Sequence, residues 1–221
     1  MATRSRHPRP PKKSLEEHRQ IQAQFLDTEL KPKLDAAQRG EGHVFFVDAA
    51  HFVFGTYLCC LWCFQRLFVR AASGRQRFNV LGAIHAITRE LIAVTNTTVV
   101  NTATMCELLH KLAASGLTGP ITVVLDNARY QRNAVVQSLA QELGITLLFL
   151  PSYSPNLNLI ERLWKFIKRH SLYGRYHATF AQFRDAIEET IRKLPTQHAS
   201  QLETLITLNF QIFEDVSLMA A

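Results

Sequence analysis

The chain has few cysteines, and three of its four lie within five residues, at Cys59, Cys60 and Cys63. No second cluster supplies the remaining ligands of a tetrahedral zinc site. The spacing is also unlike a disulfide framework, which indicates a reducing compartment. We therefore expect neither a structural zinc site nor a disulfide-stapled secreted scaffold, and we interpret the cluster as packed or half-buried thiols.

Acidic side chains are missing from residues 1–13, which hold five basic residues and three prolines. Such a composition cannot collapse into a core, so we expect a basic, extended arm. The first 40 residues also lack an apolar segment of the kind found in secretory signals. The net charge of +7 and the pI near 9.5 favour an anionic partner.

An uninterrupted membrane-spanning run is absent as well. Residues 52–69 are nearly all apolar and reach the lower edge of bilayer-spanning length, but Gln65 and Arg66 interrupt them. Many of these residues are aromatic or β-branched, which suits strands of a sheet. We therefore expect no membrane contact and a location in the cytoplasm.

Length and patterning predict one α/β domain behind a short lead-in. The 221 residues, 47% of them hydrophobic, can bury one sizeable core. We expect an arm and lead-in helix over residues 1–40 and the main domain, with helices at its C-terminal end, over 41–221. Alternating apolar runs and amphipathic stretches predict a mixed sheet covered by helices. The expected strands are 44–47, 78–87, 90–95, 121–125 and 145–150, and the expected helices begin at Ser14 and span 104–115, 133–143, 157–171 (with Asn156 as its cap), 180–194 and 199–218.

Three carboxylates stand at the ends of predicted elements. Asp48 follows the apolar run 44–47, Asp126 follows 121–125, and Glu161 lies one turn into a helix. An aspartate after a buried strand puts a charge at the carboxyl edge of the sheet, where a metal or a partner must compensate its desolvation. Three such acids in one cleft would form an oxygen-only site suited to Mg²⁺ or Mn²⁺.

Each acid also has an ordinary interpretation. The aspartates could cap a loop or a helix-entry turn, and Glu161 could form an exposed pair with Lys165. The spacing of all three together favours the shared site, since thirty-four residues separate Asp126 from Glu161.

The segments FFVDAAHFV, VLDNARYQ and LPSYSPNLNLIERLWKFIKR resemble the catalytic core of mariner-like DDE transposases, in the bacterial insertion-sequence branch (insertion sequence 630 family). The resemblance covers about residues 15–215, and the third segment is its most specific part. It implies a ribonuclease H-like fold, with Asp48 on the first strand, Asp126 after the fourth and Glu161 on a late helix.

The resemblance also implies an activity: metal-dependent cleavage at the ends of a mobile element, followed by transfer of the freed 3′-hydroxyl to target DNA. Two Mg²⁺ or Mn²⁺ ions would serve as cofactors. Asp48 would bridge both ions, and Asp126 and Glu161 would each complete one. The expected partners are element ends and target DNA, bound by a homodimer in a prokaryotic cytoplasm, at the nucleoid.

Further residues receive weaker predictions. Asn127 could hold a carboxylate or a metal-bound water. His51 could contact DNA, but we favour a solvated loop histidine. Trp62 and Trp164 could stack on bases, but we expect both to be core residues. The cations expected to bind DNA phosphates are Arg66, Arg70, Arg75, Arg77, Lys165, Lys168 and Arg169.

The chain departs from the family's pattern at its start. Mariner-like transposases carry two helix-turn-helix units before the catalytic core, whereas about 40 residues precede the first predicted strand here. Recognition of element ends would then come from a separately encoded helix-turn-helix subunit or an upstream reading frame. The alternative function is a catalytically idle remnant that binds DNA through its basic residues and regulates full-length relatives.

Overall fold

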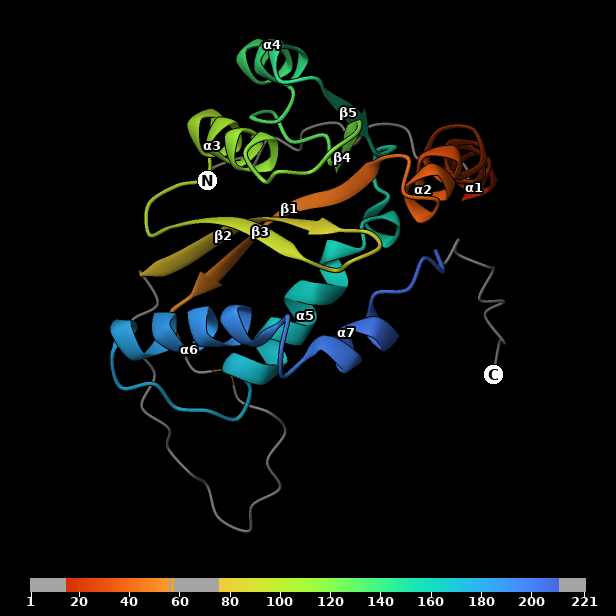
Figure 1. The fold of residues 1–221 in the computed structure, drawn as a ribbon. Helices are drawn as coiled ribbons and strands as arrows, with labels where there is room; N and C mark the ends of the chain where they lie inside the picture. The colour runs from red at the N-terminus through yellow and green to blue at the C-terminus, as the bar shows by residue number, and fades with distance from the viewer. Residues whose placement is uncertain (1–14, 56, 58–75, 211–221) are drawn as a thin grey trace, which may run out of the picture.

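A five-stranded mixed sheet forms the centre of the protein (Figure 1). The computed structural model describes residues 15–55, 57 and 76–210. The strand order is β3-β2-β1-β4-β5, with antiparallel pairing from β3 to β1 and parallel pairing from β1 to β5. The predicted mixed α/β sheet is confirmed. The strands are β1 (His43–Val53), β2 (Arg77–His85), β3 (Leu91–Asn96), β4 (Ile121–Leu125) and β5 (Ile145–Phe149).

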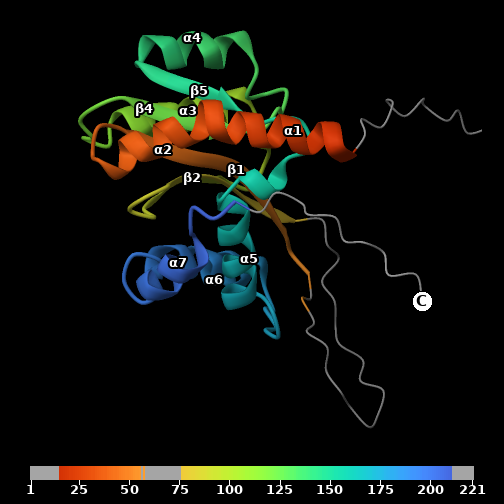
Figure 2. The same cartoon turned by 90° about the vertical axis from the view of Figure 1, so that its right-hand side faces the viewer.

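Helices cover both faces of the sheet. In Figure 1, α3 and α4 lie on one side of it and α5, α6 and α7 on the other. Figure 2 shows α1, the π-helical turn η1 and α2 as one continuous rod passing in front of the sheet. The helices are α1 (Leu15–Phe25), η1 (Leu26–Leu30), α2 (Lys31–Gln38), α3 (Thr102–Ala113), α4 (Ala134–Glu142), the 3₁₀ turn η2 (Pro155–Leu157), α5 (Ile160–Ser171), α6 (Phe180–Lys193) and α7 (Ala199–Leu205).

Strand alternation decides which way the two aspartates face. Phe45 belongs to the core on the α3–α4 side, and Phe46 belongs to the core on the α5 side. Successive side chains of a strand point to opposite faces, so Asp48 shares the α5 side with Phe46. Val124 also packs on the α5 side, and the same alternation directs Asp126 there. Both carboxylates therefore face helix α5, which carries Glu161.

The prediction that the first strand ends just before Asp48 is wrong. β1 runs on to Val53 and pairs Asp48 with Gly82 of β2. Parallel pairing with β4 stops at Phe46, whereas antiparallel pairing with β2 continues. Asp48 therefore lies in the middle of a long strand, just beyond the point where β1 loses its neighbour β4.

Two helix boundaries also differ from the prediction. Asn156 does not cap α5, because it lies in the 3₁₀ turn and its amide pairs with Gln22. The last helix, predicted over 199–218, ends at Leu205. Residues 211–218 of that prediction lie outside the described residues. Residues 207–210, the last ones that the structure describes, are not helical, and Arg162 donates to the carbonyls of Leu205, Thr207 and Asn209.

No helix within the described ranges is long and apolar enough to cross a bilayer. Residues 52 and 53 of the apolar run 52–69 belong to β1, and most of the rest of the run lies outside the described residues.

A histidine at the end of β2 is buried and pairs with a half-buried histidine at the start of β1. His85, only 4% exposed, accepts hydrogen bonds at Nδ1 from the backbone N–H groups of Ile87 and Thr88, both at 3.1 Å. Its proton must therefore sit on Nε2, which lies 3.1 Å from Nδ1 of His43. His43 in turn donates from Nε2 to the Thr118 carbonyl at 3.1 Å. Burial, and secondarily His43, lower the pKa of His85 to about 4.

This pKa predicts acid destabilisation through His85. The unfolded chain takes up the proton near pH 6.5, and the folded protein only near pH 4. The free energy of unfolding should therefore fall as the pH drops through this window, by up to about 3 kcal/mol, and His85 should contribute no pH dependence above it. Urea unfolding of wild type and His85→Asn at several pH values measures this. Asparagine keeps an acceptor for the two backbone donors, so equal pH slopes in both proteins would contradict the assignment.

Candidate active site

Asp48 is held by an indole. Its Oδ2 accepts a hydrogen bond of 3.0 Å from Nε1 of Trp164, which lies on α5 one turn after Glu161 and is 3% exposed. The prediction that Trp164 belongs to the core is confirmed. The sequence did not reveal its second role, although a buried indole N–H needs an acceptor and an aspartate was the available candidate. One side chain thus packs α5 on the sheet and fixes the carboxylate of β1.

Gly82 makes room for this indole. It lies opposite Asp48 in the register of β1 and β2. A Cβ atom at position 82 would lie 2.7 Å from Cη2 of Trp164 and 3.0 Å from Cδ1 of Leu91. Contacts at 2.7 Å are too short for real Cβ atoms, so a larger residue would displace the ring. The glycine is therefore a condition for the hydrogen bond between Trp164 and Asp48.

The three predicted acids share one electrostatic environment. Burial, together with the negative charges of Asp126 and Glu161, raises the pKa of Asp48 to about 7, against hydrogen bonds from the Ala49 backbone and from Trp164. Burial also raises the pKa of Asp126, against a hydrogen bond from Asn158. Asp48 thus lies within electrostatic reach of both other acids, and all three remain half-buried.

Tyr130 lies in the same environment. Burial, together with the charges of Asp48 and Asp126, raises the pKa of its hydroxyl to about 12. The phenol therefore stays neutral beside the carboxylates up to about pH 12.

Asn158 joins the segments that carry the acids. Its Nδ2 donates to the carbonyl of Val47 at 3.2 Å, and its side chain also hydrogen-bonds Asp126. The residue is 2% exposed, and among the described residues its Oδ1 has no donor. A buried acceptor without a donor is costly, and a cation or a metal-bound water would satisfy it. Sequence analysis missed this residue, although its place three positions before Glu161 was visible.

Glu161 enters the site from the first turn of α5. Its backbone N–H bonds the Asn158 carbonyl at 3.3 Å, which ties the start of the helix to the turn before it. Lys165 and Arg169 are exposed farther along α5, and Lys168 is half-buried. None of these three cations forms an ion pair within the part of the chain that the structure describes.

Other predicted residues fall elsewhere. Asn127 donates to the Leu150 carbonyl at 2.6 Å and accepts from Arg132, so its amide links β4 to the end of β5. His51 is held by Asn79 at 2.7 Å. Arg77 is exposed at the start of β2. The positions outside the described residues are Cys59, Cys60, Trp62, Cys63, Arg66, Arg70 and Arg75.

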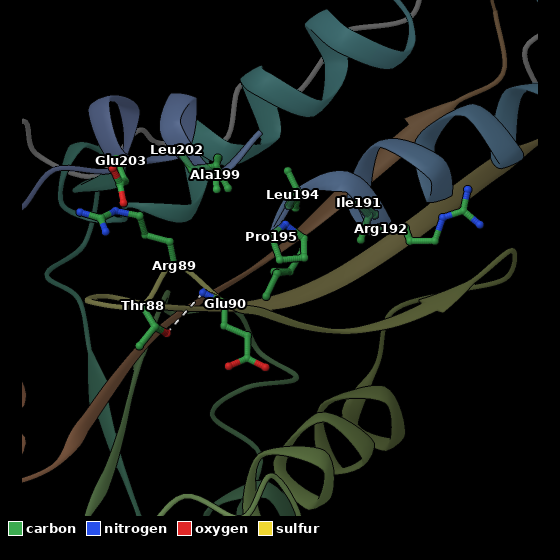
Figure 3. Close-up of a pocket in the computed structure, with 11 residues that line it drawn as sticks. Thr88, Arg89, Glu90, Ile191, Arg192, Leu194, Pro195, Ala199, Leu202 and Glu203 are labelled. Carbon is green, nitrogen blue, oxygen red and sulfur yellow. Dashed lines mark hydrogen bonds between the residues drawn. The ribbon is translucent and has the colours of Figure 1, made fainter. Parts of the chain in front are cut away.

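No group of three or more histidine, cysteine, aspartate or glutamate side chains within residues 15–55, 57 and 76–210 is assembled to hold one ion jointly. A cavity of about 520 Å³ lies between the β2–β3 turn and the segment from α6 to α7 (Figure 3), and none of the three acids lines it. A second cavity of about 450 Å³ is lined by Asp126 and by the loop after β5.

A family model described as DDE superfamily endonuclease matches residues 65–184, more than half of the chain. Comparison with curated proteins gives no match. The fold is similar to "Mos1 transposase paired-end complex with left transposon end" (TM-score 0.59, 14% identity, 95% of this chain and 68% of that chain). It is also similar to "Structure of Mos1 transposase catalytic domain and Raltegravir with Mg" (TM-score 0.52, 14% identity, covering 94% of this chain and 100% of that chain). The predicted ribonuclease H-like fold of DDE transposases is thus confirmed.

Removing the indole N–H donor of Trp164, or filling the space that Gly82 leaves for its ring, should lower the stability of the fold around Asp48. Trp164→Phe leaves Oδ2 without its donor and should cost about 1–3 kcal/mol. Gly82→Ala overpacks the same contact and should cost a similar amount. Gly55→Ala is the matched control, because its Cβ would meet nothing closer than 3.9 Å. Denaturant unfolding of each variant, alone and with Asp48→Ala, measures the coupling, and strictly additive effects of Trp164→Phe and Asp48→Ala would contradict the contact.

Proposed function

We propose that this chain, which belongs to the DDE superfamily of endonucleases, cuts DNA strands and joins them to target DNA with Asp48, Asp126 and Glu161 as its catalytic acids. The observation that carries the proposal is the electrostatic coupling of Asp48 to both other acids on the α5 face of a ribonuclease H-like sheet. Half-buried carboxylates that repel one another are unstable as a purely structural device, and they suit a cation-binding centre.

The residues present fit two divalent ions. Asp48 would contact both, with Asp126 on one and Glu161 on the other, and Mg²⁺ or Mn²⁺ would supply the positive charge that activates the attacking oxygen and stabilises the leaving one. The unpartnered Oδ1 of Asn158 gives a further acceptor at the same place.

The chain's own side chains prepare this centre. Trp164 donates to Oδ2 of Asp48 and so helps to fix the rotamer of the carboxylate. Asn158 bonds both the Val47 carbonyl of β1 and Asp126, and so fixes the position of Asp126 relative to β1. Lys165, Lys168 and Arg169 extend from Glu161 along α5 and would position the phosphates of the bound strand.

The finer assignment is a transposase of the bacterial insertion-sequence branch (insertion sequence 630 family), supported by the three motifs quoted above. Its substrates would be element ends and target DNA, bound by a homodimer, with end recognition from a separate helix-turn-helix subunit or frame. Residues 1–40 would form the arm and lead-in helix of a catalytic domain over 41–221. Asn127, through Leu150 and Arg132, would support Asp126 indirectly, and Arg66, Arg70, Arg75 and Arg77 would add phosphate contacts.

Metal titration of acid variants tests the proposal. Mn²⁺ should raise the melting temperature of wild type and support cutting of DNA, because it relieves the repulsion among the acids. Asp48→Asn, Asp126→Asn and Glu161→Gln should abolish cutting, and Asp48→Asn should raise stability without metal by removing a half-buried charge. Glu203→Gln, beside the other cavity, is the control. A wild type that binds DNA but never cuts it would instead support the idle regulator.

The α5 cations should carry part of the salt dependence of DNA binding. Replacing Lys165, Lys168 and Arg169 together by glutamine should reduce the slope of log affinity against log salt by about two to three. The matched control replaces Lys31, Lys111 and Lys193, which are already paired with Asp27, Glu107 and Glu189. Fluorescence anisotropy with random duplex at several salt concentrations decides the matter. Equal slopes in the two triple variants would place the DNA on another surface.

A further inference from the structure

We propose that Tyr153 stacks on an unpaired base of the bound DNA, beside the phosphate held at the acids. The inference rests on the proposed function and adds a substrate contact to it. It would make the loop between β5 and α5 a nucleobase site adjoining Asp126.

Tyr153 is presented to solvent at a conformational cost. Its side chain is 82% exposed, and its backbone has a φ of 61°, in the left-handed region that non-glycine residues seldom adopt. Bulky residues hold this conformation only where the surrounding structure enforces it, and such strain concentrates at functional sites. An exposed aromatic ring in this position gains nothing for the fold itself.

Helix α1 enforces the conformation of the loop. His18 bonds the carbonyl of Tyr153 at 3.1 Å, and Gln22 donates to the Ser154 hydroxyl at 3.0 Å. The amide of Gln22 also pairs with that of Asn156. Gln22 is 1% exposed, and its bond to Ser154 is buried, whereas the bond from His18 is exposed to solvent. The loop is therefore held at Tyr153 and directly after it by a helix more than a hundred residues earlier in the chain.

A cavity beside the ring suits a base. Its volume is about 450 Å³, and Asp126 and Tyr153 both line it. Much of the remaining lining is apolar, contributed by Ala128, Leu150, Pro151 and Pro155. Apolar walls with an aromatic side chain bind the π-face of any base, whereas Asp126 in the same wall lies at the acid site. A strand passing the acids would thus bring the adjoining base to Tyr153.

Binding to blunt and forked DNA tests the inference without any cutting. The probes are a short fluorescent duplex and the same duplex with mismatches that leave one end unpaired. Wild type should bind the forked probe more tightly. Tyr153→Ala should lose about fivefold or more of affinity for it and keep its affinity for the blunt probe, since stacking on one base is removed. Tyr153→Phe should retain the preference, and the exposed Tyr176→Ala is the control.

Two further variants separate stacking from a structural effect. Tyr153→Gly relieves the left-handed strain, so its melting temperature should equal or exceed that of wild type while the forked preference is lost. Gln22→Leu should weaken the preference with Tyr153 still present, because the loop is released. Equal affinity of wild type for both probes, or an unchanged preference in Tyr153→Gly, overturns the inference. If the preference depends on Tyr153 but no variant or wild type cuts DNA, only the proposed catalytic function fails.

Discussion

The structure depends on keeping one carboxylate in the middle of a packed sheet. Asp48 has neighbours on every side: Gly82 across the strand pair, Trp164 above it, and the two other acids within electrostatic reach. Burial opposes its ionisation, and a hydrogen bond from an indole offsets only part of that cost. The position is tolerable because an absent side chain at residue 82 lets the indole reach it.

That constraint organises the elements around it. Trp164 can serve Asp48 only if α5 crosses the sheet at this level, and this crossing also brings Glu161 to the site. The approach to α5 is irregular, with a 3₁₀ turn and two prolines, and so needs outside support. Asn158 ties it to β1, and Gln22 ties it to α1. The lead-in rod therefore belongs to the same packed core as α5.

Local patterns predicted what depends on neighbours in sequence. The strands, most helices and the place of Asp126 after β4 follow from runs of apolar residues, and the motifs led to the confirmed fold. The end of the first strand was misplaced because an acid ends an apolar run in sequence, whereas pairing with β2 carries the strand onward to Val53. The contact between Trp164 and Asp48 spans 116 positions, and no local pattern encodes it. The clamp of α1 on the loop before α5 escaped prediction for the same reason.

Where β1 parts from β4 has a mechanical consequence. Parallel pairing stops at Phe46, and the next carbonyl, that of Val47, is taken by a side chain, Asn158, instead of a strand. Strands β1 and β4 thus separate at the level of the two aspartates, and the amide of Asn158 makes the bond that β4 no longer makes. Because Asn158 also hydrogen-bonds Asp126, this one side chain sets how the end of β4 is placed against β1, and with it the spacing of the two aspartates.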